Sequence, residues 1–301
     1  MMLMRKIAEF YNIPIYSESN WFISFGDSPY FSHYAGSAID IYQGVRGFDG
    51  ELDAISPIDG KIINIIKIKP PIKKGYSKID YIIVLNPFSN DNYYVRMLHI
   101  APKVKVGEYI SAGDLIGQFL RSGYFYSWTD PHIHFEMRNN IDRILVARDT
   151  LPLIKILFRG NEINGEIEFD VLLEKISKYY AIGKVISQSI VFENNSLFGL
   201  SLTKNGKNIL DAGVPYYKKG LILSDFNAGE HHLSGFVIEN KNINISFKAY
   251  SKIFKGIGTA IYFSEKYFRI KLVFNNIVSS FCPSELEGQR VKINIKYSTT
   301  Q

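Results

Sequence analysis

Cysteine is almost absent from this chain of 301 residues, which contains only Cys282. A single cysteine excludes an intrachain disulfide, and it excludes a zinc site built mainly from thiolates. Any metal site must therefore be made of histidine and carboxylate side chains. Because the chain has only six histidines, the spacing of these six is informative.

Long apolar runs are also missing. No run approaches the roughly 20 residues that a membrane-spanning helix needs, so we expect no transmembrane segment. The first 15 residues carry Arg5 and Lys6, but Glu9, Asn12 and Pro14 interrupt the apolar stretch that follows. A secretory signal keeps that stretch unbroken. No such signal is visible, and the cytoplasm is the default expectation for a compartment that is otherwise unknown.

The excess of positive charge is small. The chain has 35 Lys and Arg against 29 Asp and Glu, which gives a net charge of +6. This charge suits an anionic partner without requiring one. The lysines are scattered and form no compact basic motif, so we do not expect nucleic-acid binding.

Aromatic and β-branched side chains are abundant. There are 20 Tyr and 21 Phe, isoleucine is dense between residues 55 and 83, and these residue types favour strands. From residue 31 to 138, short apolar runs alternate with turn residues. The pattern predicts a mainly all-β fold, a sandwich or barrel-like antiparallel structure. The predicted strands lie at residues 61–68, 81–85, 93–100, 115–120 and 132–138.

The length predicts two domains. We expect a first domain at residues 1–155, a connector with one helix at 156–182, and a β-rich domain of unknown role at 183–301. The helix is predicted from apolar residues at helical spacing between residues 169 and 180. One further helical turn is predicted at residues 6–11.

Four of the six histidines fall in three β-type contexts in the first half of the chain. His132 and His134 alternate on a predicted strand, so they share a face, with Cα atoms about 7 Å apart. Six residues separate His33 from Asp40, and imidazole and carboxylate are both suitable zinc ligands. His99 ends an apolar strand before a turn bounded by proline. Taken singly, each of these also reads as an ordinary strand or turn residue.

Together, these motifs resemble the lysostaphin-type zinc metallopeptidases, the LytM-like or glucose-permease-like family. The family pattern has a histidine followed shortly by an aspartate, a strand that ends in His-Leu, a Val-Lys-Val-Gly segment with later glycines, and a Pro-His-Leu-His-Phe-Glu segment. The matching segments here are His33 to Asp40, Leu98-His99-Ile100, residues 104–117 and residues 131–138. The resemblance covers roughly residues 31–155.

This resemblance implies an antiparallel scaffold of the duplicated hybrid motif type. It also implies that His33, Asp40 and His134 bind Zn²⁺, and that His99 and His132 are catalytic. Three protein ligands leave a fourth zinc position for water, whose pKa zinc lowers towards about 7. A histidine beside that position could accept a proton or stabilise an oxyanion.

The implied function is a zinc-dependent metalloendopeptidase, a hydrolase whose partner is a peptide substrate. The family's usual substrates are peptides of the cell wall or envelope. One alternative is a catalytically inactive or non-peptidase homologue that acts as a metal-retaining binding or regulatory module. Another, from the aromatic-rich second half, is a carbohydrate- or polymer-binding protein. The loop at residues 123–131 is aromatic where the family has glycine and serine, which predicts a groove of different shape.

The remaining conspicuous residues have simpler interpretations. Glu136 and Arg138 share the predicted face of the two histidines, where they either support a site or pair with each other. The glycines of residues 107–117 predict turns. The adjacent pair His231-His232 predicts a solvated loop or edge strand, and Cys282, which has no local base, predicts a buried or inert thiol.

Overall fold

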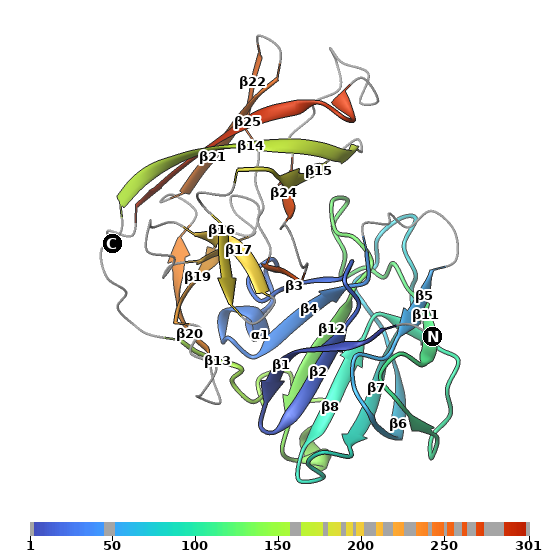
Figure 1. Ribbon diagram of the computed structural model, residues 1–301. Helices are drawn as coiled ribbons and strands as arrows, with labels where there is room; N and C mark the ends of the chain where they lie inside the picture. The colour runs from blue at the N-terminus through green and yellow to red at the C-terminus, as the bar shows by residue number, and fades with distance from the viewer. Residues whose placement is uncertain are drawn as a thin grey trace. The chain divides into compact units, whose positions relative to one another are not determined.

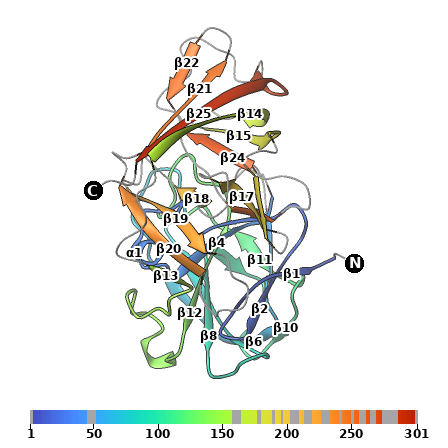
Figure 2. The ribbon, with the colours of Figure 1, turned by 60° about the vertical axis from the view of Figure 1, so that its left-hand side comes forward.

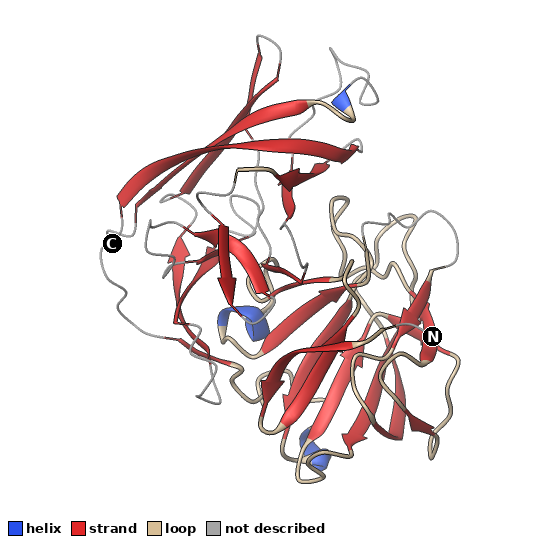
Figure 3. Cartoon of the chain, in the orientation of Figure 1, coloured by secondary structure: helices blue, strands red, loops and turns tan. Residues whose placement is uncertain are grey.

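The computed structural model describes residues 3–44, 52–156, 164–176, 180–187, 191–194, 197–201, 209–212, 219–225, 233–239, 243–249, 252–255, 261–263, 269–273 and 286–298. The described chain is mostly strand, and its sheets are antiparallel almost throughout (Figures 1 and 3). The predicted all-β fold is confirmed. No described helix combines the length and apolarity needed to cross a membrane. His231, His232 and Cys282 lie outside the described residues.

Two compact units make up the chain. One consists of residues 1–23 and 37–153, and the other of residues 24–36 and 154–301. The division into domains at 1–155, 156–182 and 183–301 stays a prediction.

The main sheet of the first unit has six antiparallel strands in the order β10-β6-β7-β8-β12-β4. The predicted strands at 61–68 and 81–85 are present in it as β6 and β7. The strand predicted at 93–100 ends as β8 at Leu98, because His99 has a φ of 73° and leaves the extended conformation. The bounds are β4 Ala38–Tyr42, β6 Gly60–Ile68, β7 Asp80–Pro87, β8 Tyr94–Leu98, β10 Tyr109–Ile110 and β12 Ile133–Arg138.

Strand β12 is buried on both faces. Its odd-numbered residues, Ile133, Phe135 and Met137, are apolar and fully buried. Its even-numbered residues, His134, Glu136 and Arg138, are polar and also buried. Since side chains alternate between the two faces of a strand, β12 presents one apolar face to the core and one polar face that must satisfy its own charges.

Smaller elements complete the first unit. Strand β11 (Leu115–Phe119) pairs with β5 (Asp53–Ile55) and with β9 (Ile100–Pro102). Strands β1 (Arg5–Phe10) and β2 (Ile13–Ser17) form a hairpin, and a 3-10 turn follows β12 at Ile141–Arg143. The helical turn predicted at residues 6–11 is wrong, because Tyr11 and Asn12 both take positive φ values and form the hairpin turn.

The second unit contains a six-stranded antiparallel sheet in the order β22-β21-β25-β14-β15-β24, visible in both ribbon views (Figures 1 and 2). It also contains a run of strands in the order β17-β18-β19-β20-β13. The bounds of the remaining elements, in chain order, are β3 Phe22–Ser24, α1 Phe31–Tyr34, β13 Ile154–Ile156, β14 Asn164–Ile176, β15 Tyr180–Val185, β16 Val191–Asn194, β17 Leu197–Ser201, β18 Ile209–Ala212, β19 Lys219–Asp225, β20 Leu233–Glu239, β21 Ile243–Ala249, β22 Lys252–Lys255, β23 Ile261–Phe263, β24 Arg269–Val273 and β25 Arg290–Ser298.

The helix predicted in the connector at 156–182 is wrong, because the described residues 164–176 form the long strand β14. Phe169, Val171 and Leu173 are buried and alternate with exposed or half-buried residues. The exposed Glu166 and Glu168 form ion pairs with lysines of the neighbouring strand β25. Apolar spacing alone allowed a helix, but pairing with β25 on one side and β15 on the other determines the strand.

Gly117 is a close-approach glycine rather than a turn residue. It lies inside β11, opposite β9, and a Cβ atom there would overlap the backbone carbonyl oxygen of Ala101. Gly107, by contrast, has a φ of 92° and open space around it.

We therefore predict that Gly117→Ala lowers the free energy of unfolding by about 3 kcal/mol, because the sheet must shift to relieve the overlap. Gly107→Ala is the matched control, and it should cost only about 1 kcal/mol for its backbone conformation. Urea unfolding of the two variants checks this, and equal losses would show that β9 and β11 are not held this closely.

Candidate metal centre

The backbone register of β4 and β12 places Asp40 beside His134. The two residues are direct partners across the antiparallel pair. The His134 Nδ1 atom lies 2.9 Å from the Asp40 Oδ1 atom, and both side chains are buried. Asp40 lies between Ile39 and Ile41, so strand alternation turns its carboxylate to the polar face of the sheet.

His33 reaches the same place from the short helix α1. Its Nδ1 atom lies 2.6 Å from the backbone carbonyl oxygen of Phe25. A carbonyl oxygen only accepts hydrogen bonds, so Nδ1 carries the proton and Nε2 is the ring atom that could bind a metal. His33 and Asp40 are separated along the chain because the helix must end before β4 begins. Gly36, with a φ of 65°, ends it.

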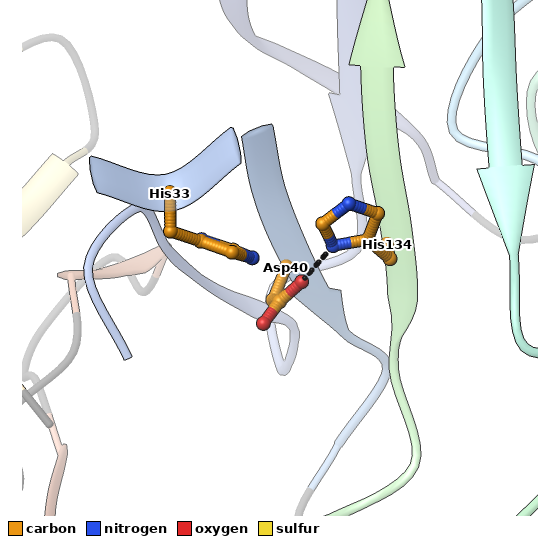
Figure 4. A group of neighbouring side chains, drawn as sticks. All are labelled: His33, Asp40 and His134. Atoms are coloured by element: carbon orange, nitrogen blue, oxygen red, sulfur yellow. Dashed lines mark hydrogen bonds and ion pairs between the residues drawn. The ribbon is translucent and has the colours of Figure 1, made fainter. Parts of the chain in front are cut away.

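One ligand atom from each of His33, Asp40 and His134 lies within 4.8 Å of the other two. Figure 4 shows the His33 ring directed toward the Asp40 carboxylate, with His134 on the other side of that carboxylate. Two imidazole nitrogens and a carboxylate oxygen are a donor set that zinc accepts in catalytic sites. The three residues could therefore hold a metal ion.

Glu136 contacts the ring nitrogen of His134 that does not contact Asp40. Its Oε1 atom lies 2.9 Å from His134 Nε2. Its other oxygen accepts a hydrogen bond from Arg138 and lies 3.6 Å from Arg96 Nε. A metal-binding histidine usually donates its second ring N–H to such a carboxylate or carbonyl, which fixes the ring and its tautomer. His134, held by Glu136, and His33, held by the Phe25 carbonyl, both follow this rule.

Neighbouring charged side chains shift the pKa values of His134 and Glu136. Burial lowers the pKa of His134, but the hydrogen bonds and charges of Asp40 and Glu136 outweigh burial and raise it to about 9. Burial raises the pKa of Glu136, but His134 and the two neighbouring arginines outweigh it and lower that pKa to about 2. Glu136 is therefore ionised at neutral pH.

His99 stands beside the group, on the turn between β8 and β9. Its ring centroid lies 5.3 Å from that of His132 and 6.0 Å from that of His134. Its Nδ1 atom lies 2.6 Å from Asp80 Oδ2, and Asp80 is fully buried. Burial raises the pKa of Asp80, but His99, Ser122 and the Tyr81 backbone together lower it below its ordinary value.

His132 precedes β12 and faces the same space. Its Nδ1 atom lies 2.9 Å from the backbone carbonyl oxygen of Asp130, and its Nε2 atom lies 3.5 Å from Asp40 Oδ1. Burial lowers the pKa of His132 to about 3 despite the nearby Asp40 carboxylate. The ring is therefore neutral, with Nδ1 protonated and Nε2 directed to the site.

The structure thus brings all five predicted site residues together. From the sequence, Glu136 was expected either to support the site or to pair with Arg138, and Asp80 and Ser122 were not identified. A hairpin drawn between the strands predicted at 81–85 and 93–100 would have put Asp80 near His99, since Ile82 pairs with Leu98.

A family model matches residues 14–155 of this chain, and it describes the N-terminal domain of a domain of unknown function, DUF8155. No curated protein matches.

Three solved structures to which this chain is similar are a metalloprotease, lysostaphin and a peptidase. The M23 metalloprotease pseudoalterin from the deep sea has 15% identity and a TM-score of 0.29, over 51% of this chain and 75% of that one. Lysostaphin has 17% identity and a TM-score of 0.25, over 60% of this chain and 83% of that one. A zinc-containing peptidase from Vibrio cholerae has 23% identity and a TM-score of 0.24, over 44% of this chain and 37% of that one.

The support that Glu136 gives to His134 yields a direct prediction. Glu136→Gln removes the carboxylate charge behind His134, so the affinity for Zn²⁺ should fall by about 10–100-fold. Competition with a zinc chelator measures the affinity. Glu168→Gln, on the exposed face of β14, is the matched control and should leave the affinity unchanged. An unaltered affinity in Glu136→Gln would show that Glu136 does not tune the metal ligand.

Proposed function

We propose that this protein is a zinc-dependent endopeptidase that hydrolyses peptide bonds, with peptides of the cell wall or envelope as the expected substrate class. The observation that carries the proposal is the convergence of His33, Asp40 and His134, beside two further histidines whose rings face the same space. Zinc ligands alone would suit a structural site. Two additional oriented imidazoles at the open side suit catalysis.

A bound Zn²⁺ would polarise the scissile carbonyl and lower the pKa of water, which is the chemistry that peptide hydrolysis needs. His33, Asp40 and His134 would hold it and leave one position open. The single carboxylate ligand balances one of its two positive charges. The site therefore keeps a net attraction for the partial negative charge that grows on the carbonyl oxygen.

His99 and His132 have different surroundings, which suggests different roles. His99 is held by the buried carboxylate of Asp80, and a general base is commonly oriented by a third group in this way. His132 is held by a neutral carbonyl. We assign proton transfer to His99, and orientation of the reacting groups to His132.

The aromatic loop covers these two histidines. The Phe125 ring centroid lies 4.7 Å from that of His99 and 4.9 Å from that of His132. The Tyr124 ring lies 5.8 Å from His99. These rings keep bulk water away from both imidazoles and strengthen the electrostatic interactions at the site.

The test is a cleavage assay of the zinc-loaded protein on a peptide library that includes cell-wall crosslink peptides. We expect His134→Ala to lose both zinc and activity, because it removes a ligand. His99→Ala should keep zinc and lose about 10²–10⁴-fold in kcat, because it removes the group assigned to proton transfer. His132→Ala should also keep zinc and lose activity. Zinc content and cleavage products, measured by mass spectrometry, give the two readouts.

Asp91→Asn, at an exposed loop position, is the control and should match the unmodified protein in both. Zinc binding without any cleavage would replace the peptidase with a metal-retaining binding or regulatory module. Loss of zinc in His132→Ala to the same extent as in His134→Ala would overturn the separation of ligand and catalytic histidines.

A further inference from the structure

Asp80 is a fully buried carboxylate that is not among the ligand group of the metal centre. It opens β7, while His99 follows the end of β8. Because β7 and β8 are antiparallel, with Ile82 opposite Leu98, both residues lie at the same end of the hairpin. The pairing of β7 with β8 therefore places the carboxylate of Asp80 beside His99, whose ring faces the metal centre.

The two oxygens of Asp80 have different partners. Oδ1 accepts hydrogen bonds from two backbone N–H groups, those of Tyr81 at 2.8 Å and His99 at 3.1 Å. Oδ2 accepts from two side chains, the His99 Nδ1–H at 2.6 Å and the Ser122 hydroxyl at 2.6 Å. Four donors converge on one carboxylate, so its orientation is fixed.

His99 also has a backbone conformation that needs this support. Its φ of 73° lies in the left-handed region, which is strained for a residue with a side chain. The N–H of His99 and its ring both bond to Asp80, and its carbonyl oxygen accepts from the backbone N–H of Leu120 at 2.8 Å. These three contacts hold the backbone and the ring of His99 in one position.

We propose that Asp80 is the positioning residue that selects the catalytic tautomer of His99, with the proton on Nδ1 and the lone pair on Nε2. This proposal rests on the proposed peptidase function for its consequence, but its geometric claim is independent of it. The Nε2 atom accepts the proton of the attacking water as the carbon–oxygen bond forms. It then gives that proton to the amide nitrogen as the carbon–nitrogen bond breaks.

Because the two oxygens of Asp80 accept from different kinds of donor, the substitution Asp80→Asn has a specific expected effect on His99. In Asp80→Asn, the one amide oxygen will remain with the two backbone N–H groups, because these donors cannot turn away. The NH₂ group then replaces Oδ2 and faces His99. A donor opposite Nδ1 requires an unprotonated Nδ1, so the proton moves to Nε2 and His99 can no longer accept one there.

The test is nitrogen-15 NMR of the histidine rings in the full-length, zinc-loaded protein, with His99 assigned by comparison with His99→Gln. We expect a protonated Nδ1 on His99 in the unmodified chain and an unprotonated Nδ1 in Asp80→Asn, with equal zinc content. Ser122→Ala removes a donor to Oδ2 but leaves the carboxylate, so it should keep Nδ1 protonated. Asp91→Asn controls for the change of charge.

The kinetic arm uses the same variants. Asp80→Asn should lower kcat by about 10²–10⁴-fold with little change in KM, since the residue touches no substrate. An unprotonated Nδ1 in the unmodified protein, or a protonated Nδ1 in Asp80→Asn, overturns the proposal. If no peptide is cleaved by the unmodified protein, the proposed function fails, and the NMR result still decides the role of Asp80.

Discussion

The candidate site depends on the neutralisation of one buried carboxylate, that of Glu136. It is 2% exposed, and an isolated charge at such a depth would destabilise the fold by several kcal/mol. Arg96, Arg138 and His134 surround it. The backbone carbonyls of Ile144 and Val146 fix the two arginines, so Glu136 has one orientation, and this orientation turns the Nδ1 atom of His134 toward Asp40.

The four histidines of the candidate site share a second feature. In each, one ring nitrogen contacts a fixed acceptor, and the other is directed toward the site. The acceptors are the Phe25 carbonyl for His33, Glu136 for His134, Asp80 for His99 and the Asp130 carbonyl for His132. Preorganisation of this kind lowers the cost of assembling a metal site and of aligning proton donors and acceptors.

The strands of the first unit and the shared face of His132 and His134 could be predicted from the sequence, because alternation along residues 132–138 is a local signal. The grouping of His33 and Asp40 with them was expected only from the family resemblance, and the ligand role of the group stays a prediction. The supporting contacts could not be predicted, because they depend on register. Asp80 meets His99 only through the pairing of β7 with β8, and the positive φ of His99 has no signature in its residue type. The prediction of a connector helix is wrong for a related reason. The apolar spacing of residues 169–176 suits a helix, but the partner strands on both sides hold β14 extended.

The most direct test of the proposed zinc ligands is a crystal structure of the zinc-soaked protein, with anomalous data collected at the zinc absorption edge. We predict one zinc ion bonded to His33 Nε2, an Asp40 oxygen and His134 Nδ1 at about 2.0–2.2 Å. Glu136 should remain on His134 Nε2, and His99 and His132 should stand off the metal. Zinc bound through His134 Nε2, zinc ligated by His132, or no zinc at these three residues would contradict this prediction.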